Sequence, residues 1–527
     1  MGRAELLIVG LAIAVVGLSA LAHRVSVPYP IVLVVGGAVL GFVPGLPEVK
    51  LDPDAVLVVF LPLLLYGSSI WANFGDLRAN LRGLTLSTVG LVLATMCAVA
   101  WAAHSLISGL PWDAAFVLGA IVAPTDPLAA ATIMRRLDVP RRMVSVVEGE
   151  GLFNDATALV AYRVGVAAVV AGSFSFAEAG LKFILGAAGG VAIGLVVGWS
   201  VAQIRKRTTD AQVSVTISLL TGYAAFVPAD VIGASGVLAT VTAGIYMGIR
   251  APQILPARVR LQGFFVWDIL DFVVNAILFV LIGLQLRAVV ESLSGYSAAS
   301  LVGYALAVAG VVVATRLVWF FTMPYLIRAL DRRPAQRARR VTARWRLVLA
   351  WSGMRGAVSL AVALALPVTT DAGAAFPKRD LLVFLTFAVI FFTLVVQGLS
   401  LPVLIRRLGV SDGGADSDEE IRARLGATKA ALDELDALAG EDWTRDETVE
   451  RLRRAYDYRK RRFAARAGKI EDDGYEDQSL AYQRTLQHVL AAQRDALVRM
   501  RGDGKISNEV MNRVLRDLDL EESRLEI

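Results

Sequence analysis

The feature that most constrains this chain is a succession of apolar segments between Glu5 and Arg406, each long enough to cross a lipid bilayer. About thirteen such segments can be marked, and glycine, proline or a carboxylate interrupts several of them. Hydrophobic residues make up 56% of the 527 residues, and the mean hydropathy is +0.59, more apolar than a domain that faces water on all sides. The sequence therefore predicts an all-α polytopic membrane protein.

The composition changes at about residue 410. From Asp412 onward no segment of that kind remains, and Asp, Glu, Arg, Ala and Leu recur with helical spacing. Helices are predicted at 420–438, 448–466 and 480–500, with glycine-rich joints at 413–414 and 502–504. We expect a transmembrane domain at 1–410 and a cytoplasmic α-helical region at 411–527. The tail either only supports solubility and folding or has a regulatory or dimer-contact role.

Basic residues gather in alternate loops, which orients the chain by the positive-inside rule. The basic clusters are Arg24, Arg78 with Arg82, 135–142, 205–207, 250–260 and 328–346. These loops are predicted to be cytoplasmic, so the N-terminus lies outside and the C-terminus inside, which agrees with an odd number of spans. Arg heavily outnumbers Lys and no organelle address is present, which favours a bacterial plasma membrane.

Several chemistries have no support in the sequence. The single cysteine, Cys97, lies in an apolar stretch, so neither a disulfide framework nor a thiolate metal cluster is expected. The three histidines are scattered and indicate no metal site. No phosphate-binding loop of the Gly-x-x-x-x-Gly-Lys-Ser/Thr type occurs, so ATP is not predicted to drive the protein. We expect no cofactor and no nucleic-acid partner.

Two spans are interrupted at mid-depth. The fifth contains Ala-Pro-Thr-Asp-Pro at 123–127, and the twelfth contains Trp-Ser-Gly-Met-Arg-Gly at 351–356. If spans one to six and eight to thirteen form two inverted repeats, these are the fifth helix of each repeat. Interrupted helices at equivalent positions indicate a transport site, because unwound backbone offers carbonyl oxygens and helix ends to an ion.

Asp126 lies between two prolines, where a helix cannot keep its hydrogen-bond ladder. Thr125 adds a hydroxyl, so this stretch offers carbonyl, hydroxyl and carboxylate oxygens, which suit a hard alkali cation such as Na+. The alternative is a proline-kinked helix in which Asp126 caps the second half-helix, and the two roles are compatible.

The sixth span reads Glu-Gly-Glu-Gly-Leu-Phe-Asn-Asp-Ala-Thr from 148 to 157. Glu148 and Asp155 share one helix face, and Glu150 and Asn154 share a neighbouring face. Burial disfavours a charged carboxylate, so a proton can compete with a cation at Asp155. Such competition is the physical basis of exchange at one site. The alternative is that Asp155 only pairs with a buried arginine.

Three arginines lie within predicted spans, where an unpaired guanidinium is costly. Arg355, between two glycines, is predicted to pair with Glu150 and so to link the fifth and sixth spans to the broken twelfth, and a purely structural role is favoured for this pair. Arg163 has Glu148 or Asp155 as candidate partners, and Arg316 has Asp268 or Asp271. The sequence does not choose among these last pairings.

These residues resemble the monovalent cation:proton antiporter family, the sodium/proton exchangers of the NhaP type. The resemblance is carried by Phe-Leu-Pro-Leu-Leu-Leu-Tyr at 60–66, by 123–127, by 149–155 and by Gly-Met-Arg-Gly-Ala-Val-Ser-Leu at 353–360. It implies thirteen helices, crossed broken helices, a dimerisation domain with a mobile core, and a homodimer.

The resemblance also assigns roles by position. Asp155 looks like the cation- and proton-binding carboxylate, and its site is completed by Asn154, Thr125 and Asp126. Glu150 and Arg355 look like the conformational ion pair. The Asn-Asp order at 154–155 implies electroneutral exchange. Many relatives carry a glutamate where this chain has Gly67, which puts cation selectivity in question, with Ser68 and Ser69 as weak substitutes.

Three alternatives remain. Potassium/proton exchange uses similar ligands, because Na+ and K+ differ mainly in size. An intramembrane aspartyl protease using Asp126 and Asp155 is a different class, but no Gly-x-Gly-Asp stretch supports it. A passive channel is a third, and broken helices with buried carboxylates favour alternating access over an open pore.

Overall fold

The computed structural model describes residues 3–25, 27–44, 56–72, 74–79, 81–172, 176–293, 295–330, 341–411, 415–471, 473–523 and 525. Across these ranges every regular element is a helix, apart from one isolated bridge between Thr369 and Ala375. The prediction of an all-α protein is confirmed. Contacts divide the chain into two compact units, Met1–Ser411 and Asp412–Ile527.

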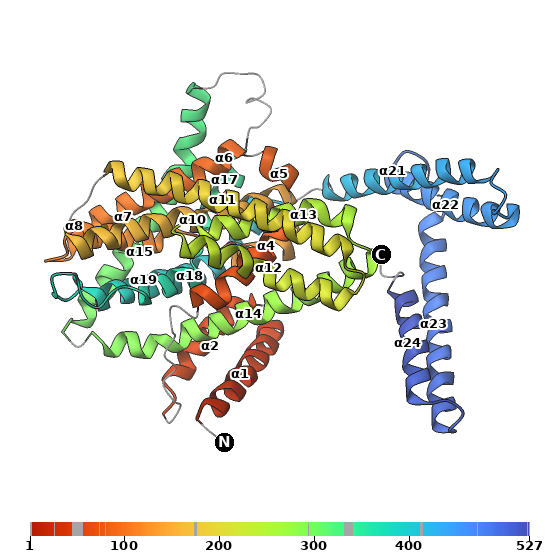
Figure 1. Cartoon of the computed structure of the whole chain (residues 1–527), viewed down its shortest axis with the longest axis horizontal. Coiled ribbons are helices and arrows are strands. Elements are labelled where there is room, and N and C mark those ends of the chain that lie inside the picture. Colours follow the sequence, from red (N-terminus) through yellow and green to blue (C-terminus); the bar gives the residue numbers. More distant parts are fainter. Residues whose placement is uncertain are drawn as a thin grey trace. The chain divides into compact units, whose positions relative to one another are not determined.

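The first unit is a bundle in which most of the long helices run along a similar direction (Figure 1). Its helices up to the first break are α1 (Arg3–Val25), α2 (Tyr29–Gly41), η1 (Val56–Phe60), α4 (Leu61–Ile70), α5 (Phe74–Ala79), α6 (Leu81–Thr85), η2 (Leu86–Leu91), α7 (Val92–Leu106) and α8 (Trp112–Val122). The others are α9 (Pro127–Arg136), α10 (Arg141–Ala171), α11 (Phe176–Arg207), α12 (Ala211–Val231), α13 (Gly236–Ile254), α14 (Ala257–Glu291), α15 (Ala298–Leu330), α17 (Ala343–Trp351), α18 (Ala357–Leu364), α19 (Arg379–Phe392), η3 (Thr393–Gln397) and α20 (Gly398–Leu408).

Eight helices in the described ranges are long and apolar enough to cross a membrane, and three shorter apolar helices lie at Val9–Val25, Tyr29–Gly41 and Leu57–Ile70. These apolar helices identify a multi-pass membrane protein. The count of thirteen spans, the inverted repeat and the orientation of the termini stay predictions. Much of the basic segment at 328–346 lies outside the described residues.

Both predicted interruptions are present. The span from Trp112 breaks between α8 and α9, where residues 123–126 leave the helix before Pro127 starts the next one. The second break separates α17 from α18 over Ser352–Gly356. Proline fixes the backbone at the first break, and glycine relaxes it at the second, so local sequence explains both.

Helices approach one another closely where they present glycine. A Cβ on Gly37 of α2 would lie 2.4 Å from the Val280 carbonyl oxygen of α14, and one on Gly283 would lie 2.3 Å from the Val34 oxygen. Small residues permit such backbone contact between helices in lipid, where packing must replace the hydrophobic effect. This close contact sets α14 against the rest of the bundle and so positions the side chains at its middle.

The second unit consists of α21 (Ala415–Leu438), α22 (Asp446–Arg466), α23 (Tyr475–Gly502) and α24 (Asn508–Glu522). The three helices predicted in the tail are confirmed, and the predicted joint at 502–504 falls between α23 and α24. The other predicted joint, at 413–414, lies outside the described residues.

Candidate functional site

The two breaks meet. The backbone N–H of Asp126 donates a 2.8 Å hydrogen bond to the Met354 carbonyl oxygen, so the unwound segments of the two interrupted helices touch. Gly356 makes room for this contact, because a Cβ at that position would lie 2.1 Å from Oδ2 of Asp126. The crossing brings exposed backbone and polar side chains of both helices to one place, as an ion site formed from broken helices requires.

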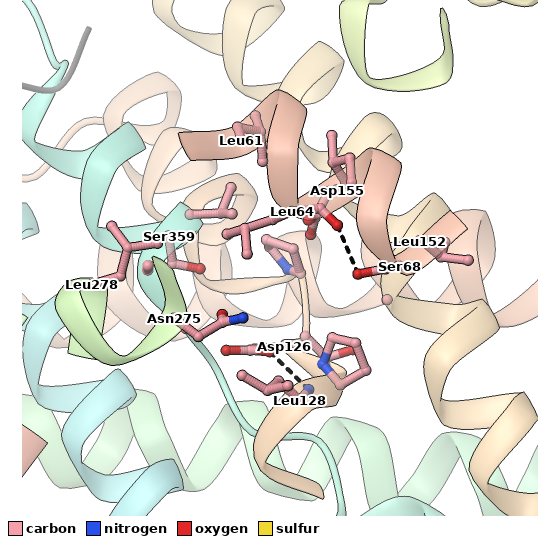
Figure 2. Close-up of a pocket in the computed structure, with 18 of the residues that line it drawn as sticks. Leu61, Leu64, Ser68, Asp126, Leu128, Leu152, Asp155, Asn275, Leu278 and Ser359 are labelled. Atoms are coloured by element: carbon pink, nitrogen blue, oxygen red, sulfur yellow. Dashed lines mark hydrogen bonds between the residues drawn. The ribbon is translucent and has the colours of Figure 1, made fainter. Parts of the chain in front are cut away.

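A cavity of about 90 Å³ opens beside this crossing (Figure 2). Its wall combines α4, the first break, α10, α14 and the start of α18. The polar side chains that line it are Ser68, Thr125, Asp126, Asp155, Asp271, Asn275 and Ser359. The lining contains three carboxylates and no lysine or arginine, so the chemistry of the cavity favours cations.

Asp155 lines this cavity from α10 and is half-buried. Within the described part of the chain its carboxylate forms no ion pair, so the alternative in which it only pairs with an arginine finds no partner. Asp126 lines the same cavity from the first break. Its Oδ1 accepts a 2.9 Å hydrogen bond from the backbone N–H of Leu128, so it caps α9 as the alternative predicts, and the cation-binding role stays a prediction.

Thr125 and Asn154 form a buried network behind the cavity wall. Nδ2 of Asn154 donates to the Thr125 hydroxyl at 2.7 Å and to the Thr125 carbonyl oxygen at 3.3 Å. The Thr125 hydroxyl donates in turn to Glu150 at 3.3 Å. Thr125 lines the cavity and Asn154 does not. Asn154, the residue before Asp155, thus holds the unwound segment of the first break in place.

The predicted pair of Glu150 and Arg355 is wrong in this structure. The Glu150 carboxylate accepts hydrogen bonds from both terminal nitrogens of Arg316, and both side chains are almost fully buried. Nε of Arg355 donates at 3.0 Å to the Val122 carbonyl oxygen, and Nη1 donates to the Gly353 carbonyl oxygen. Arg355 therefore neutralises the C-terminal end of α8, where carbonyl oxygens lack helical partners.

Arg316 reaches Glu150 from α15 and also contacts the C-terminal end of α17. Its Nε donates to the Ala350 carbonyl oxygen at 3.1 Å, and Nη2 donates to the Leu349 oxygen at 3.2 Å. A Cβ on Gly353 would lie 2.4 Å from the Arg316 side chain, so this glycine lets the guanidinium pass. The buried pair thus connects α10, α15 and the second broken helix.

The remaining intramembrane pairings differ from those considered in the sequence. Arg163 pairs with Asp230 of α12, and Glu148 pairs with Arg135 of α9. These partners are half-exposed, so each pair contributes little to stability. Arg316 pairs with Glu150, not with its two candidate partners from the sequence. Those two, Asp268 and Asp271, both lie on α14. Pairing depends on which helices are neighbours, which the linear sequence does not state.

The proposed ligand set missed part of the cavity wall. Asp271 and Asn275 of α14, with Ser359 of α18, line the cavity beside the expected residues. The sequence offers Asp271 only as a candidate partner of Arg316, but its four-residue spacing to Asn275 is a signal that one helix face carries both. Ser68 lines the cavity too, with its hydroxyl donating to the Leu64 carbonyl oxygen at 2.7 Å.

Gly67 does not belong to the cavity wall. A Cβ built there would lie 3.1 Å from the indole ring of Trp267, on α14. The first carbon of a larger side chain at this position would therefore press against the ring of Trp267, which is itself buried. Glycine at position 67, where many relatives carry glutamate, allows α4 to pack closely on Trp267.

The family described as "Sodium/hydrogen exchanger, transmembrane" matches residues 10–407, which include both breaks and every residue of the cavity wall. The chain belongs to this family. The match confirms the family resemblance, and it makes the protein a multi-pass membrane transporter of the cation/proton exchanger class.

Individual relatives agree with this exchanger along most of their length. An Na(+)/H(+) exchanger of Mycobacterium tuberculosis (strain ATCC 25618 / H37Rv) is 37% identical over 522 residues, which are 98% of this chain and 95% of the relative. A "sodium, potassium, lithium and rubidium/H(+) antiporter" of Bacillus subtilis (strain 168) is 31% identical over 413 residues, 76% of this chain and 61% of that protein.

A solved structure shares the fold. The sodium proton antiporter MjNhaP1 from Methanocaldococcus jannaschii superimposes with a TM-score of 0.59 at 18% sequence identity, covering 77% of this exchanger and 99% of that chain. The agreement confirms the transporter fold.

Proposed function

We propose that this exchanger moves Na+ in one direction and H+ in the other across the membrane, with both ions competing for Asp155 in alternating access. The observation that carries the proposal is the Asp155 carboxylate itself. It lines a cavity at the crossing of two broken helices, and no lysine or arginine of the described part of the chain lines that cavity beside it. Such a carboxylate needs either a proton or a bound cation.

The neighbouring oxygens fit a hard monovalent cation. Asp126, Thr125 and Ser68 line the cavity with carboxylate, hydroxyl and carbonyl oxygens, the ligands that alkali cations accept. Asn154 and Glu150 do not line the cavity but hold Thr125 in position through hydrogen bonds. One carboxylate that takes either one proton or one Na+ gives an exchange of equal charges, so transport is proposed to be electroneutral.

Potassium/proton exchange is the second candidate. The Bacillus subtilis relative is named for sodium, potassium, lithium and rubidium, and the present cavity has no ligand that only Na+ can use. Cation size then decides between the candidates, because K+ needs longer ligand distances than Na+.

We further propose the setting in which the exchanger works. It is placed in the bacterial plasma membrane with the N-terminus outside and the C-terminal unit in the cytoplasm, following the distribution of basic residues. A homodimer is proposed, with part of the first unit as a dimerisation domain and the part around the breaks as a mobile core. The second unit is proposed to regulate transport or to contact a partner subunit.

The test uses purified protein in proteoliposomes with an imposed pH gradient and a fluorescent reporter of internal pH. Addition of Na+ or Li+, but not choline, is expected to dissipate the gradient, and Asp155→Asn is expected to abolish the response. Dissipation mainly by K+ selects the second candidate. Clamping the membrane potential with valinomycin and equal K+ on both sides leaves the rate unchanged if exchange is electroneutral.

The matched control is Asp210→Asn. Asp210 is an exposed carboxylate that caps α12, and asparagine caps helices equally well. This variant is expected to transport like the wild type. Absence of any cation-dependent proton flux from folded wild-type protein contradicts the proposed function.

A further inference from the structure

The inner part of α14 supplies a carboxylate that the site at Asp155 leaves unexplained. Asp271 and Asn275 lie one turn apart and both line the cavity. Figure 2 shows Asn275 extending from its helix toward the region of Asp126. A carboxylate at such depth is costly unless it has a function, because water and counter-ions are scarce there.

Asp271 and Asn275 are preorganised as a pair of oxygen donors. Nδ2 of Asn275 donates to Oδ1 of Asp271 at 3.1 Å and to the Asp271 carbonyl oxygen at 2.8 Å. These bonds fix the amide, so its oxygen is left for another partner. Asn275 is only 8% exposed, and across the described residues its Oδ1 accepts no hydrogen bond. A fixed carboxylate and an amide oxygen are ligands for a hard cation.

The charge of the cavity calls for more than one cation or proton. Asp126, Asp155 and Asp271 line a volume of about 90 Å³ that no lysine or arginine enters. Nevertheless, in the described ranges no three acidic or histidine side chains converge closely enough to hold one metal ion. One ion bound at Asp155 therefore leaves the Asp271 carboxylate of α14 without a cation of its own.

We propose that Asp271 and Asn275 form a second cation position in this cavity, which Na+ occupies on its way to or from Asp155. The inference rests on the proposed function, because it takes the transported ion as the ligand. The second position raises the local concentration of Na+ beside Asp155 and contributes to the choice among alkali cations. Asp271 is thus a further binding residue of the exchanger, and Asn275 is its positioning and ligating neighbour.

The first arm of the test measures flux in proteoliposomes as a function of Na+ concentration. Asp271→Asn is expected to keep Na+-dependent proton flux, since Asp155 is intact, with an apparent KM for Na+ raised about tenfold. Asn275→Leu keeps the carboxylate and is expected to raise the KM in the same direction. An apparent KM within twofold of the wild type in both variants overturns the proposal.

The control for this arm is Asp268→Asn. Asp268 is an exposed carboxylate one turn from Asp271 on the same helix. Its removal changes the charge of α14 equally but takes no ligand from the cavity, so less than a twofold change in KM is expected. An equal rise in KM for Asp268→Asn and Asp271→Asn assigns the effect to long-range charge and overturns the second position.

The second arm measures binding without transport, as the Na+-dependent rise in melting temperature of the detergent-purified exchanger, with choline as the reference cation. Asp155→Asn is expected to retain part of this rise, and Asp155→Asn/Asp271→Asn is expected to lose it. Complete loss in Asp155→Asn alone overturns the proposal. If the wild type shows no proton flux, the proposed function fails, and this arm still decides whether Na+ binds at Asp271.

Discussion

The backbone N–H of Asp126 and the carbonyl oxygen of Met354 are joined by a 2.8 Å hydrogen bond, which connects the unwound segments of the two interrupted helices. Each partner lies in a segment that has left its helix, so each group would otherwise lack a backbone partner inside the bundle. The contact fixes the position of Asp126 relative to the second break. The geometry of the cavity therefore depends on Met354, a residue that does not line it.

Gly356→Ala is expected to disturb this crossing. The added Cβ would lie 2.1 Å from Oδ2 of Asp126 and 2.7 Å from its Cβ, so the carboxylate has to move. Overpacking of this kind costs about 1–3 kcal/mol of unfolding free energy. We expect a lower melting temperature together with a higher apparent KM for Na+.

The matched control for that substitution is Gly303→Ala in α15, where a Cβ would meet nothing within 4 Å. Alanine is the better helix former, so this variant should be as stable as the wild type or more stable by about 0.5–1 kcal/mol. Equal effects of the two substitutions on transport would show that the tight crossing is unimportant.

The pairing of Glu150 can be measured by double-mutant cycles. Glu150→Gln and Arg316→Gln should each cost about 3–5 kcal/mol, because each leaves a buried charge alone. The double variant should lose much less than the sum. The corresponding cycle of Glu150→Gln with Arg355→Gln should give a coupling under about 1 kcal/mol. Stronger coupling to Arg355 than to Arg316 would restore the pairing expected from sequence.

Thr125→Val removes a hydroxyl that Asn154 donates to and that itself donates to Glu150. Two buried polar partners then lose a hydrogen bond, at a cost of about 1–3 kcal/mol in unfolding free energy. Thr125→Ser keeps the hydroxyl and should behave nearly like the wild type in thermal unfolding and in flux. A stable, fully active Thr125→Val variant would show that the network is dispensable.

Competition at one carboxylate fixes the sign of the pH dependence. Protons and Na+ exclude each other at Asp155, so lowering the pH must weaken apparent Na+ binding. Where the ion-free site is mostly protonated, each fall of one pH unit should raise the apparent KM for Na+ about tenfold with an unchanged maximal rate. Flux measured at equal pH on both sides of the membrane tests this, with labelled Na+ as the reporter. A KM that stays constant over two pH units argues for separate sites.

The sequence alone determined the features that depend on local chemistry. Long apolar segments require a helical membrane protein, and the prolines at 124 and 127 and the glycines at 353 and 356 break helices wherever those helices lie. Asp155 and Asp126 are predicted as site residues because a carboxylate within an apolar span is rare without a function. The tail helices follow from their own spacing of apolar and charged residues.

Only the tertiary structure decided which distant groups meet. Glu150 and Arg316 are separated by 166 positions, and nothing in either neighbourhood distinguishes Arg316 from Arg355 as the partner. Asp271 and Asn275 join the cavity because α14 packs closely against α2 through glycines on both helices. The physical reason is that charge pairing and cavity formation depend on the packing of whole helices, whereas helix breaks and apolar spans are set within a few turns of chain.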